Sequence, residues 1–215
     1  MTAALSPGDL PALSADGLAR LQALLAGGQR KLLGLVGAPG AGKSTLALAL
    51  LHAVGADRAQ VVPMDGFHLA NVELQRLGRD GRKGAPDTFD SAGYVALLQR
   101  LRDQRPGGDI VYAPEFRREI EEPVAGAIAV LPQTQLVITE GNYLLLWPAA
   151  AALLDEAWYV EVDDTLRRDR LTRRHEQFGR TPEAAIAWVA ATDDPNAWLI
   201  ESTRGHADHV VHLGR

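Results

Sequence analysis

The 215-residue chain has no cysteine and no long apolar segment, and both absences exclude whole classes of protein. Without thiols there is no disulfide framework, no thiolate metal site and no thiol nucleophile. No apolar run approaches the ~20 residues of a membrane-spanning helix, and residues 1–10 lack the basic and apolar regions of a signal peptide. We therefore expect a cytoplasmic protein that does not contact a membrane.

An excess of positive charge is also missing. The chain has 22 Lys and Arg against 27 Asp and Glu, which gives a formal net charge of -5. A chain with this balance has no general attraction for nucleic acid or for an anionic membrane surface. We expect no nucleic-acid partner, and any anion must be bound by a local cluster of cations.

Short apolar segments alternate with helical patterns along most of the chain. Strands are expected at 32–36, 61–64, 109–112, 127–131, 136–139, 158–162 and 209–213. Helices are expected at 14–25, 44–54, 91–104, 165–178 and 182–191, the first within a leading segment 1–30. This alternation predicts an α/β protein with a mostly parallel sheet flanked by helices, and the length and 47% hydrophobic content predict one domain over 1–215.

A phosphate-binding motif follows the first expected strand. Its residues are Gly37-Ala38-Pro39-Gly40-Ala41-Gly42-Lys43-Ser44, followed by Thr45. In the pattern G-x-x-x-x-G-K-[ST], small residues let backbone N–H groups surround the phosphates at a helix N-terminus, while Lys43 adds charge and Ser44 offers Mg²⁺ an oxygen. The motif predicts ATP and Mg²⁺ binding and a three-layer P-loop NTPase fold, but it leaves kinase, GTPase and motor ATPase open.

Two carboxylates, Asp65 and Glu140, each follow an apolar strand. Ligands of open α/β sheets bind beyond the carboxyl ends of the strands, so both side chains should face the phosphates. One carboxylate can hold Mg²⁺ and the other can accept the proton of an attacking hydroxyl. We assign Glu140, with Ser44, to the metal and Asp65 to the base. The exchanged assignment, and simple turn capping by either residue, stay open.

The segment 66–90 favours a small acceptor. It is rich in Gly, Arg and Asp and shows weak periodicity, as functional loops do. Arg82 and Lys83 suit an acceptor with hydroxyls or an acidic group, and His68 could donate or accept a hydrogen bond. A solvated basic turn and a packing histidine are the alternatives. No Asn-Lys-x-Asp run is present for reading guanine, which argues against a GTPase.

The region 163–178 carries five arginines on an expected helix. Three of them have an acid four residues earlier, in the pairs Asp163–Arg167, Asp164–Arg168 and Asp169–Arg173. Arg170 and Arg174 have none and stand four residues apart, so an anion between them would relieve their repulsion. The transferring phosphate is the expected anion, and this region is the expected lid. A solvated basic face is the alternative. The three histidines at 206, 209 and 212 are treated as structural.

Several motifs together resemble one kinase superfamily. They are Asp65-Gly66-Phe67-His68-Leu69, the run from Arg82-Lys83-Gly84-Ala85-Pro86 to Asp90, Glu140-Gly141-Asn142-Tyr143 with the three leucines that follow, and Arg174-His175. This set resembles the phosphoribulokinase, uridine kinase and pantothenate kinase superfamily. It is most similar to the bacterial proteins called fructose transport system kinases, over residues from about 31 to the end.

The resemblance implies roles for particular residues. The Asp of the Asp-Gly-Phe motif is the superfamily's base, which maps onto Asp65, and its lid arginines clamp the phosphates, which maps onto Arg170 and Arg174. Pantothenate kinases have a Tyr-Ser-His motif where this chain has Tyr112-Ala113-Pro114, which argues against pantothenate. The close relatives also have an acid where this chain has Arg117, so no acceptor name transfers.

The sequence therefore predicts an ATP-dependent kinase that phosphorylates a hydroxyl of a small metabolite, such as a nucleoside or a sugar. The predicted catalytic residues are Asp65, Lys43, Arg170 and Arg174, and the predicted acceptor-binding residues are His68, Arg82, Lys83, Tyr112 and Asn142. A pantothenate kinase and a non-catalytic ATP-binding regulatory module are the alternatives. The expected partner is the small-molecule acceptor, and a homodimer is left open.

Overall fold

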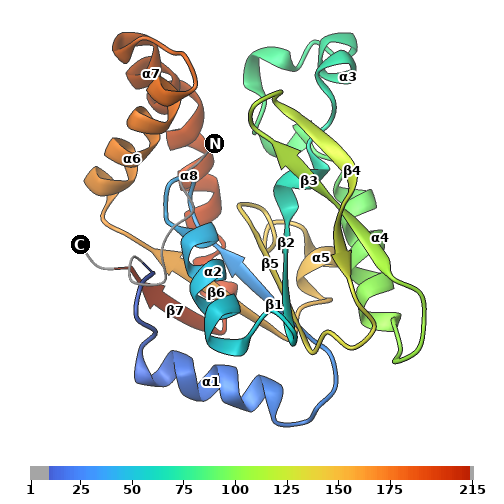
Figure 1. The fold of residues 1–215 in the computed structure, drawn as a ribbon. Helices are drawn as coiled ribbons and strands as arrows, with labels where there is room; N and C mark the ends of the chain where they lie inside the picture. The colour runs from blue at the N-terminus through green and yellow to red at the C-terminus, as the bar shows by residue number, and fades with distance from the viewer. Residues whose placement is uncertain (1–9, 214–215) are drawn as a thin grey trace.

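A parallel sheet of five strands forms the centre of the molecule, whose computed structural model describes residues 10–213 (Figure 1). The strand order is β2-β5-β1-β6-β7, and each neighbouring pair is parallel. The strands are β1 Lys31–Val36, β2 Ala59–Pro63, β5 Leu136–Gly141, β6 Glu156–Glu161 and β7 His209–His212. What the sequence predicts for residues 1–9 lies outside the described range.

Helices cover both faces of this sheet. The core on one face contains side chains of α1 (Ala15–Leu25) and α2 (Lys43–Val54), and the core on the other face contains side chains of α4 (Ser91–Asp103), α5 (Pro148–Ala151) and α8 (Asp194–Glu201). All six residues of β5 are buried, as expected for a strand covered on both faces. The predicted three-layer α/β architecture is confirmed.

An antiparallel ribbon stands apart from the parallel sheet. It consists of β3 (Val111–Arg117) and β4 (Glu122–Val130), both longer than the sequence predicts. Figure 1 shows the ribbon beside α4 and below α3 (Asn71–Arg76). On the other side of the sheet, α6 (Asp164–Gln177) and α7 (Pro182–Trp188) rise from the same edge. The ribbon and these helices thus flank the carboxyl ends of the central strands.

The segment 66–90 is more ordered than the sequence predicts. It contains α3 and 3-10 turns at Met64–Phe67, Asp80–Arg82 and Pro86–Thr88. Its two ends meet in a β-bridge between His68 and Phe89, and the Tyr143 hydroxyl donates to the Gly84 carbonyl over 2.6 Å. Six helical residues are too few to show a clear period, which is why α3 escapes sequence reasoning.

The C-terminal helices also differ from the prediction. The expected helix 182–191 ends as α7 at Trp188, passes through a π-helical turn at Val189–Asp193 and continues as α8. Pro195 suggests a helix end in the sequence, but it occupies the first turn of α8, where proline is tolerated. No helix among residues 10–213 combines the length and the apolar character that a bilayer crossing needs.

Candidate active site

The phosphate loop joins the carboxyl end of β1 to the N-terminus of α2. Gly40 and Gly42 adopt φ values of 81° and 96°, a region that favours glycine. A Cβ atom at Gly40 would lie 2.9 Å from the backbone carbonyl oxygen of Arg167, so the close approach also requires glycine. The Lys43 ammonium donates to the carbonyls of Gly37, over 2.9 Å, and Ala38, over 3.1 Å. The Lys43 side chain is therefore held against the backbone of the phosphate loop, where it is expected to bind the phosphates.

The neighbouring strand β5 brings two further groups to this loop. Because β1 and β5 are parallel neighbours, Glu140 and Asn142 follow at the same edge as the loop. The Ser44 hydroxyl donates to Glu140 Oε1 over 2.8 Å, and Lys43 Nζ donates to Asn142 Oδ1 over 2.7 Å. A hydroxyl and a carboxylate in contact are hard oxygen donors of the kind that Mg²⁺ prefers, so this pair fits the ion.

Burial shifts the pKa values of Lys43 and Glu140. It lowers the pKa of Lys43 to about 8, although the charges of Glu140 and Asp65 work in the opposite direction. Burial also raises the pKa of Glu140, and the nearby Asp65 carboxylate adds to that effect. The buried carboxyl group thus lacks enough positive charge around it, which a divalent cation would supply.

Asp65 lies in the 3-10 turn that follows β2. Its carboxylate is 3.5 Å from Nη2 of Arg118, and its backbone carbonyl accepts a hydrogen bond of 2.7 Å from Nδ1 of His68. Burial by itself would raise the pKa of the Asp65 carboxyl, but the charges of His68, which is protonated in the acid range where a carboxyl titrates, and of Arg118 hold it below its usual value. The carboxylate is therefore ionised at neutral pH and can accept a proton.

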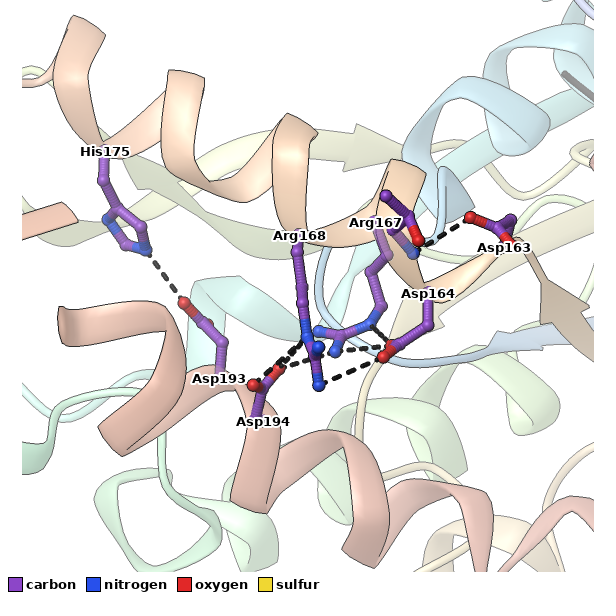
Figure 2. A network of polar contacts seen from close by, with 8 residues as sticks. Asp163, Asp164, Arg167, Arg168, His175, Asp193 and Asp194 are labelled. Carbon is purple, nitrogen blue, oxygen red and sulfur yellow. Dashed lines mark hydrogen bonds and ion pairs between the residues drawn. The ribbon is translucent and has the colours of Figure 1, made fainter. Parts of the chain in front are cut away.

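The helix α6, where the sequence predicts a lid, is anchored by a buried ion pair that differs from the predicted one. Asp163 caps the helix by accepting from the N–H of Thr165 over 2.9 Å, so the predicted Asp163–Arg167 pair does not form. Arg167 instead binds Asp164 over 2.7 Å and Asp194 over 2.6 Å (Figure 2). An acid at the N-cap position stabilises a helix by accepting from its first backbone N–H groups, and its carboxylate is then not free to pair with an arginine one turn later.

The other two predicted ion pairs of α6 are confirmed. Arg168 lies 3.1 Å from Asp164, and Arg173 lies 3.0 Å from Asp169.

Arg170 and Arg174 form no ion pair within residues 10–213, and both line the central cavity. Burial and the charge of nearby Arg118 lower the pKa of Arg174. The two arginines without an acidic neighbour in the sequence are thus the two that face the site.

The junction between the π-helical turn and α8 supplies two consecutive carboxylates that hold α6 at both ends. Asp194 binds Arg167 near the start of the helix, while Asp193 Oδ2 lies 2.9 Å from Nε2 of His175 near its end (Figure 2). Single π turns within helices frequently occur at functional sites. Both contacts escape sequence reasoning because 18 and 27 residues separate the partners.

One cavity of about 1130 Å³ collects most of the predicted site residues. The phosphate loop shares it with Asp65, His68, Lys83, Glu140, Asn142, Arg170 and Arg174. Arg82 and Tyr112 do not line it: Arg82 pairs with Asp87 over 2.6 Å, and Tyr112 is exposed on the ribbon. The volume exceeds that of a typical single-ligand pocket, roughly 300–1,000 Å³, and leaves room for two ligands.

Several cavity residues escape the sequence analysis. Asn71, Phe116 and Arg118 line the side near Asp65, and Arg180 and Trp188 line the side near α6. The Arg180 guanidinium lies 3.8 Å from the centroid of the Trp188 ring. Asn71 lies in the predicted acceptor segment 66–90, and Phe116 and Arg118 flank Arg117, where the chain departs from its relatives, so these three have a sequence signal. The rest are brought to the cavity by tertiary packing.

Comparisons with known proteins place these features in a family, although no family model matches the chain. A Schizosaccharomyces pombe protein named as a uridine kinase is 36% identical over 200 residues, which cover 85% of this chain and 83% of the relative. An ATP-dependent kinase-like protein of Aspergillus versicolor is 39% identical over 159 residues, covering 69% and 92%.

A solved structure agrees with these relatives. The crystal structure of a Silicibacter protein named as a fructose transport system kinase has a TM-score of 0.80 and 37% identity, covering 93% of this chain and all of the other. The chain thus shares its fold with a solved structure that is named as a kinase. The chain belongs to the phosphoribulokinase, uridine kinase and pantothenate kinase superfamily of P-loop kinases and is an ATP-dependent phosphotransferase.

Proposed function

We propose that the chain transfers the γ-phosphoryl group of ATP to a hydroxyl group of a small metabolite such as a nucleoside, a sugar or a related compound. The observation that carries this proposal is the position of the ionised Asp65 carboxylate in the same cavity as the phosphate loop. Nucleotide binding alone does not need a base at that position. Transfer to a hydroxyl does, because the attacking oxygen must lose its proton.

The donor side of the site is formed by the phosphate loop and its neighbours. Backbone N–H groups of the phosphate loop, apart from Pro39, which has none, would bind the β- and γ-phosphates together with the Lys43 ammonium, and Ser44 and Glu140 would hold Mg²⁺. When bound, the ion neutralises phosphate charge as the leaving group departs. Lys43 releases its carbonyl and Asn142 contacts in part, so that its N–H groups turn toward the phosphate oxygens.

The transfer step uses Asp65 and the lid arginines. A bond forms between the acceptor oxygen and the γ-phosphorus, the bond from that phosphorus to the oxygen bridging the β-phosphate breaks, and ADP leaves. The hydroxyl proton moves to the Asp65 carboxylate. Arg170 and Arg174 approach the transferring group from α6 and stabilise its charge together with Lys43.

The test is ADP release from Mg²⁺·ATP across a panel of nucleosides, sugars, sugar acids, sugar phosphates and pantothenate. With a true acceptor, Asp65→Asn should lower kcat by about 10²–10⁴-fold, the usual contribution of a general base, with little change in ATP affinity. Asp103→Asn, on the exposed end of α4, is the control and should leave kcat unchanged.

Two results would contradict the proposal. If Asp65→Asn keeps near-normal turnover, the base assignment is wrong and Glu140 becomes the candidate. If ATP binds but no compound in the panel stimulates ADP release, the alternative function, an ATP-binding regulatory module, is favoured instead.

A further inference from the structure

We propose that the phosphoryl acceptor is an anionic hydroxy compound, with its carboxylate or phosphate bound by Lys83 and Arg118 and a second hydroxyl bound by Nε2 of His68. This inference rests on the function proposed above, and it names the substrate class of the same site. It is drawn from the part of the cavity wall between Asp65 and the ribbon.

The polar groups of this wall lie around one aromatic ring. The Phe116 side chain comes from β3 and lines the cavity. The Lys83 ammonium lies 5.1 Å from the centroid of its ring, and the Arg118 guanidinium carbon lies 5.9 Å from it. The His68 ring centroid is 4.6 Å away. Two cations and an imidazole therefore lie around one ring on the acceptor side of the site.

Neither cation forms a short ion pair with an acid among residues 10–213. The Lys83 ammonium donates to Asn71 Oδ1 over 2.6 Å and to the backbone carbonyl of Glu121, and both acceptors are uncharged. Lys83 forms no ion pair among residues 10–213. The Glu122 carboxylate nearby is occupied, because it accepts from the Asn71 N–H over 3.0 and 3.1 Å. An N–H of Lys83 and most of its charge remain available to a ligand.

Arg118 is similarly available. Its contact with Asp65, at 3.5 Å, is longer than the 2.7–2.9 Å typical of a charged hydrogen bond. Three acids, Asp80, Glu119 and Glu121, also line the cavity, but all three are exposed, while Lys83 and Arg118 are half-buried. Water screens exposed charges more strongly, so these three acids offset the two cations only in part.

His68 adds a hydrogen-bond acceptor of fixed orientation. Its Nδ1 contacts the Asp65 carbonyl over 2.7 Å, and a carbonyl can only accept, so the proton of the neutral ring is on Nδ1. Nε2 then presents a lone pair. The rings of Phe89 and Phe116 lie beside the imidazole, with centroids 4.0 and 4.6 Å away, and restrict its tilt. A ligand group that meets Nε2 must be a donor, which a hydroxyl is.

Asp65 ties these groups together, because its carbonyl contacts His68 and its carboxylate contacts Arg118. The reacting hydroxyl, the second hydroxyl and the anionic group must therefore lie within one compact molecule. Sugar acids, small hydroxy acids and sugar phosphates have this arrangement. Uncharged nucleosides and free sugars lack the anionic group.

Calorimetric binding of matched pairs tests the inference without requiring turnover. With Mg²⁺ and a non-hydrolysable ATP analogue present, gluconate is compared with sorbitol, glycerate with glycerol, and ribose 5-phosphate with ribose. In at least one pair the anion should bind at least tenfold more tightly. The first two pairs identify a carboxylate and the third a phosphate. Lys83→Met should remove most of this preference, whereas Arg76→Met, on exposed α3 and paired with Glu73, should retain it.

The proposed contact between His68 and the second hydroxyl is tested with a separate variant, His68→Phe. For the anion that binds, replacement of its second hydroxyl by hydrogen should weaken binding about tenfold in the wild type, the effect of one lost hydrogen bond, and hardly at all in His68→Phe.

The inference is overturned if no anion binds, if neutral compounds bind equally well, or if the preference survives in both Lys83→Met and Arg118→Met. Anion binding without phosphorylation would contradict the proposed function and leave the binding site standing.

Discussion

At the scale of single residues, Lys43 shows how contacts within the protein position a phosphate-binding group. Its ammonium is buried and is held by two backbone carbonyls and by Asn142. The sequence analysis assigned Asn142 to the acceptor, but its side-chain oxygen lies against the phosphate-loop lysine. A single sequence identifies the lysine through its motif, whereas the partner on β5 becomes visible only when the two strands are paired.

The lowered pKa of Lys43 predicts that ATP affinity depends on pH. The phosphates bind the ammonium form, and in the free protein burial brings the pKa of Lys43 to about 8. Above pH 8, binding must therefore take up a proton, and the dissociation constant should rise about tenfold per pH unit. Titration of Mg²⁺·ATP binding between pH 7 and 9.5 measures this slope.

Lys43→Arg is the control for that titration. Its guanidinium stays charged over this range, so its affinity should be independent of pH whatever its absolute value. A flat profile for the wild type would show that Lys43 keeps its proton in the free protein.

At the scale of elements, the helix α6 has one face for anchoring and another for chemistry. Arg174 faces the cavity and its chain neighbour Arg173 points to an exposed partner, Asp169. Removing a group that stabilises the transferring phosphoryl should lower kcat strongly, by roughly 10²–10³-fold. We expect this for Arg174→Ala and a change below about twofold for Arg173→Ala, measured with saturating substrates. Equal effects of the two variants would assign α6 a purely structural role.

The anchoring face makes a separate prediction about stability. Asp194 is 12% and Arg167 4% exposed in their side chains, and removing one partner of such a buried pair costs about 3 kcal/mol or more. Asp194→Asn should lower the free energy of unfolding by that amount in urea titrations. Asp169→Asn removes an exposed pair and should change it by less than about 0.5 kcal/mol. A small effect of Asp194→Asn would mean that Asp164 alone neutralises Arg167.

Elements with a strong pattern could be predicted from the sequence, and elements defined by contacts could not. The central strands and α2, α4 and α6 lie where apolar runs and caps predict them. The ribbon was foreseen only in part, since its half-exposed strands lack a continuous apolar run. Helix α8 was missed because Pro195 resembles a stop signal, and α3 because it is short.

The same distinction applies to the candidate site. Residues within motifs, such as Lys43, Ser44 and Asp65, could be named in advance, and the cavity collects them. Trp188 could not, because nothing in its neighbourhood along the chain distinguishes a cavity wall from a core. Contacts between distant segments decide that difference.

At the scale of the whole molecule, ligand binding should stabilise the fold. A nucleotide present at 100 times its dissociation constant adds about 2.7 kcal/mol, which for a chain of this size corresponds to roughly 5–10 °C in Tm. A non-hydrolysable ATP analogue with Mg²⁺ should produce this shift in thermal unfolding, and EDTA should reduce it. In Glu140→Gln the shift should no longer depend on Mg²⁺, while Glu201→Gln, at the exposed last residue of α8, should behave as the wild type. Unchanged Mg²⁺ dependence in Glu140→Gln would remove Glu140 from the metal site.

The separation of the ribbon from the parallel sheet has a consequence for how such a kinase can diversify. Phosphate-binding and metal-binding groups are built on β1, β5 and α2, whereas Phe116 and Arg118 come from a hairpin that shares no hydrogen-bonded strand pairing with that sheet. Substitutions in the hairpin can therefore accumulate without disturbing the ATP machinery. During evolution, such substitutions can change which metabolite is phosphorylated while ATP remains the phosphoryl donor.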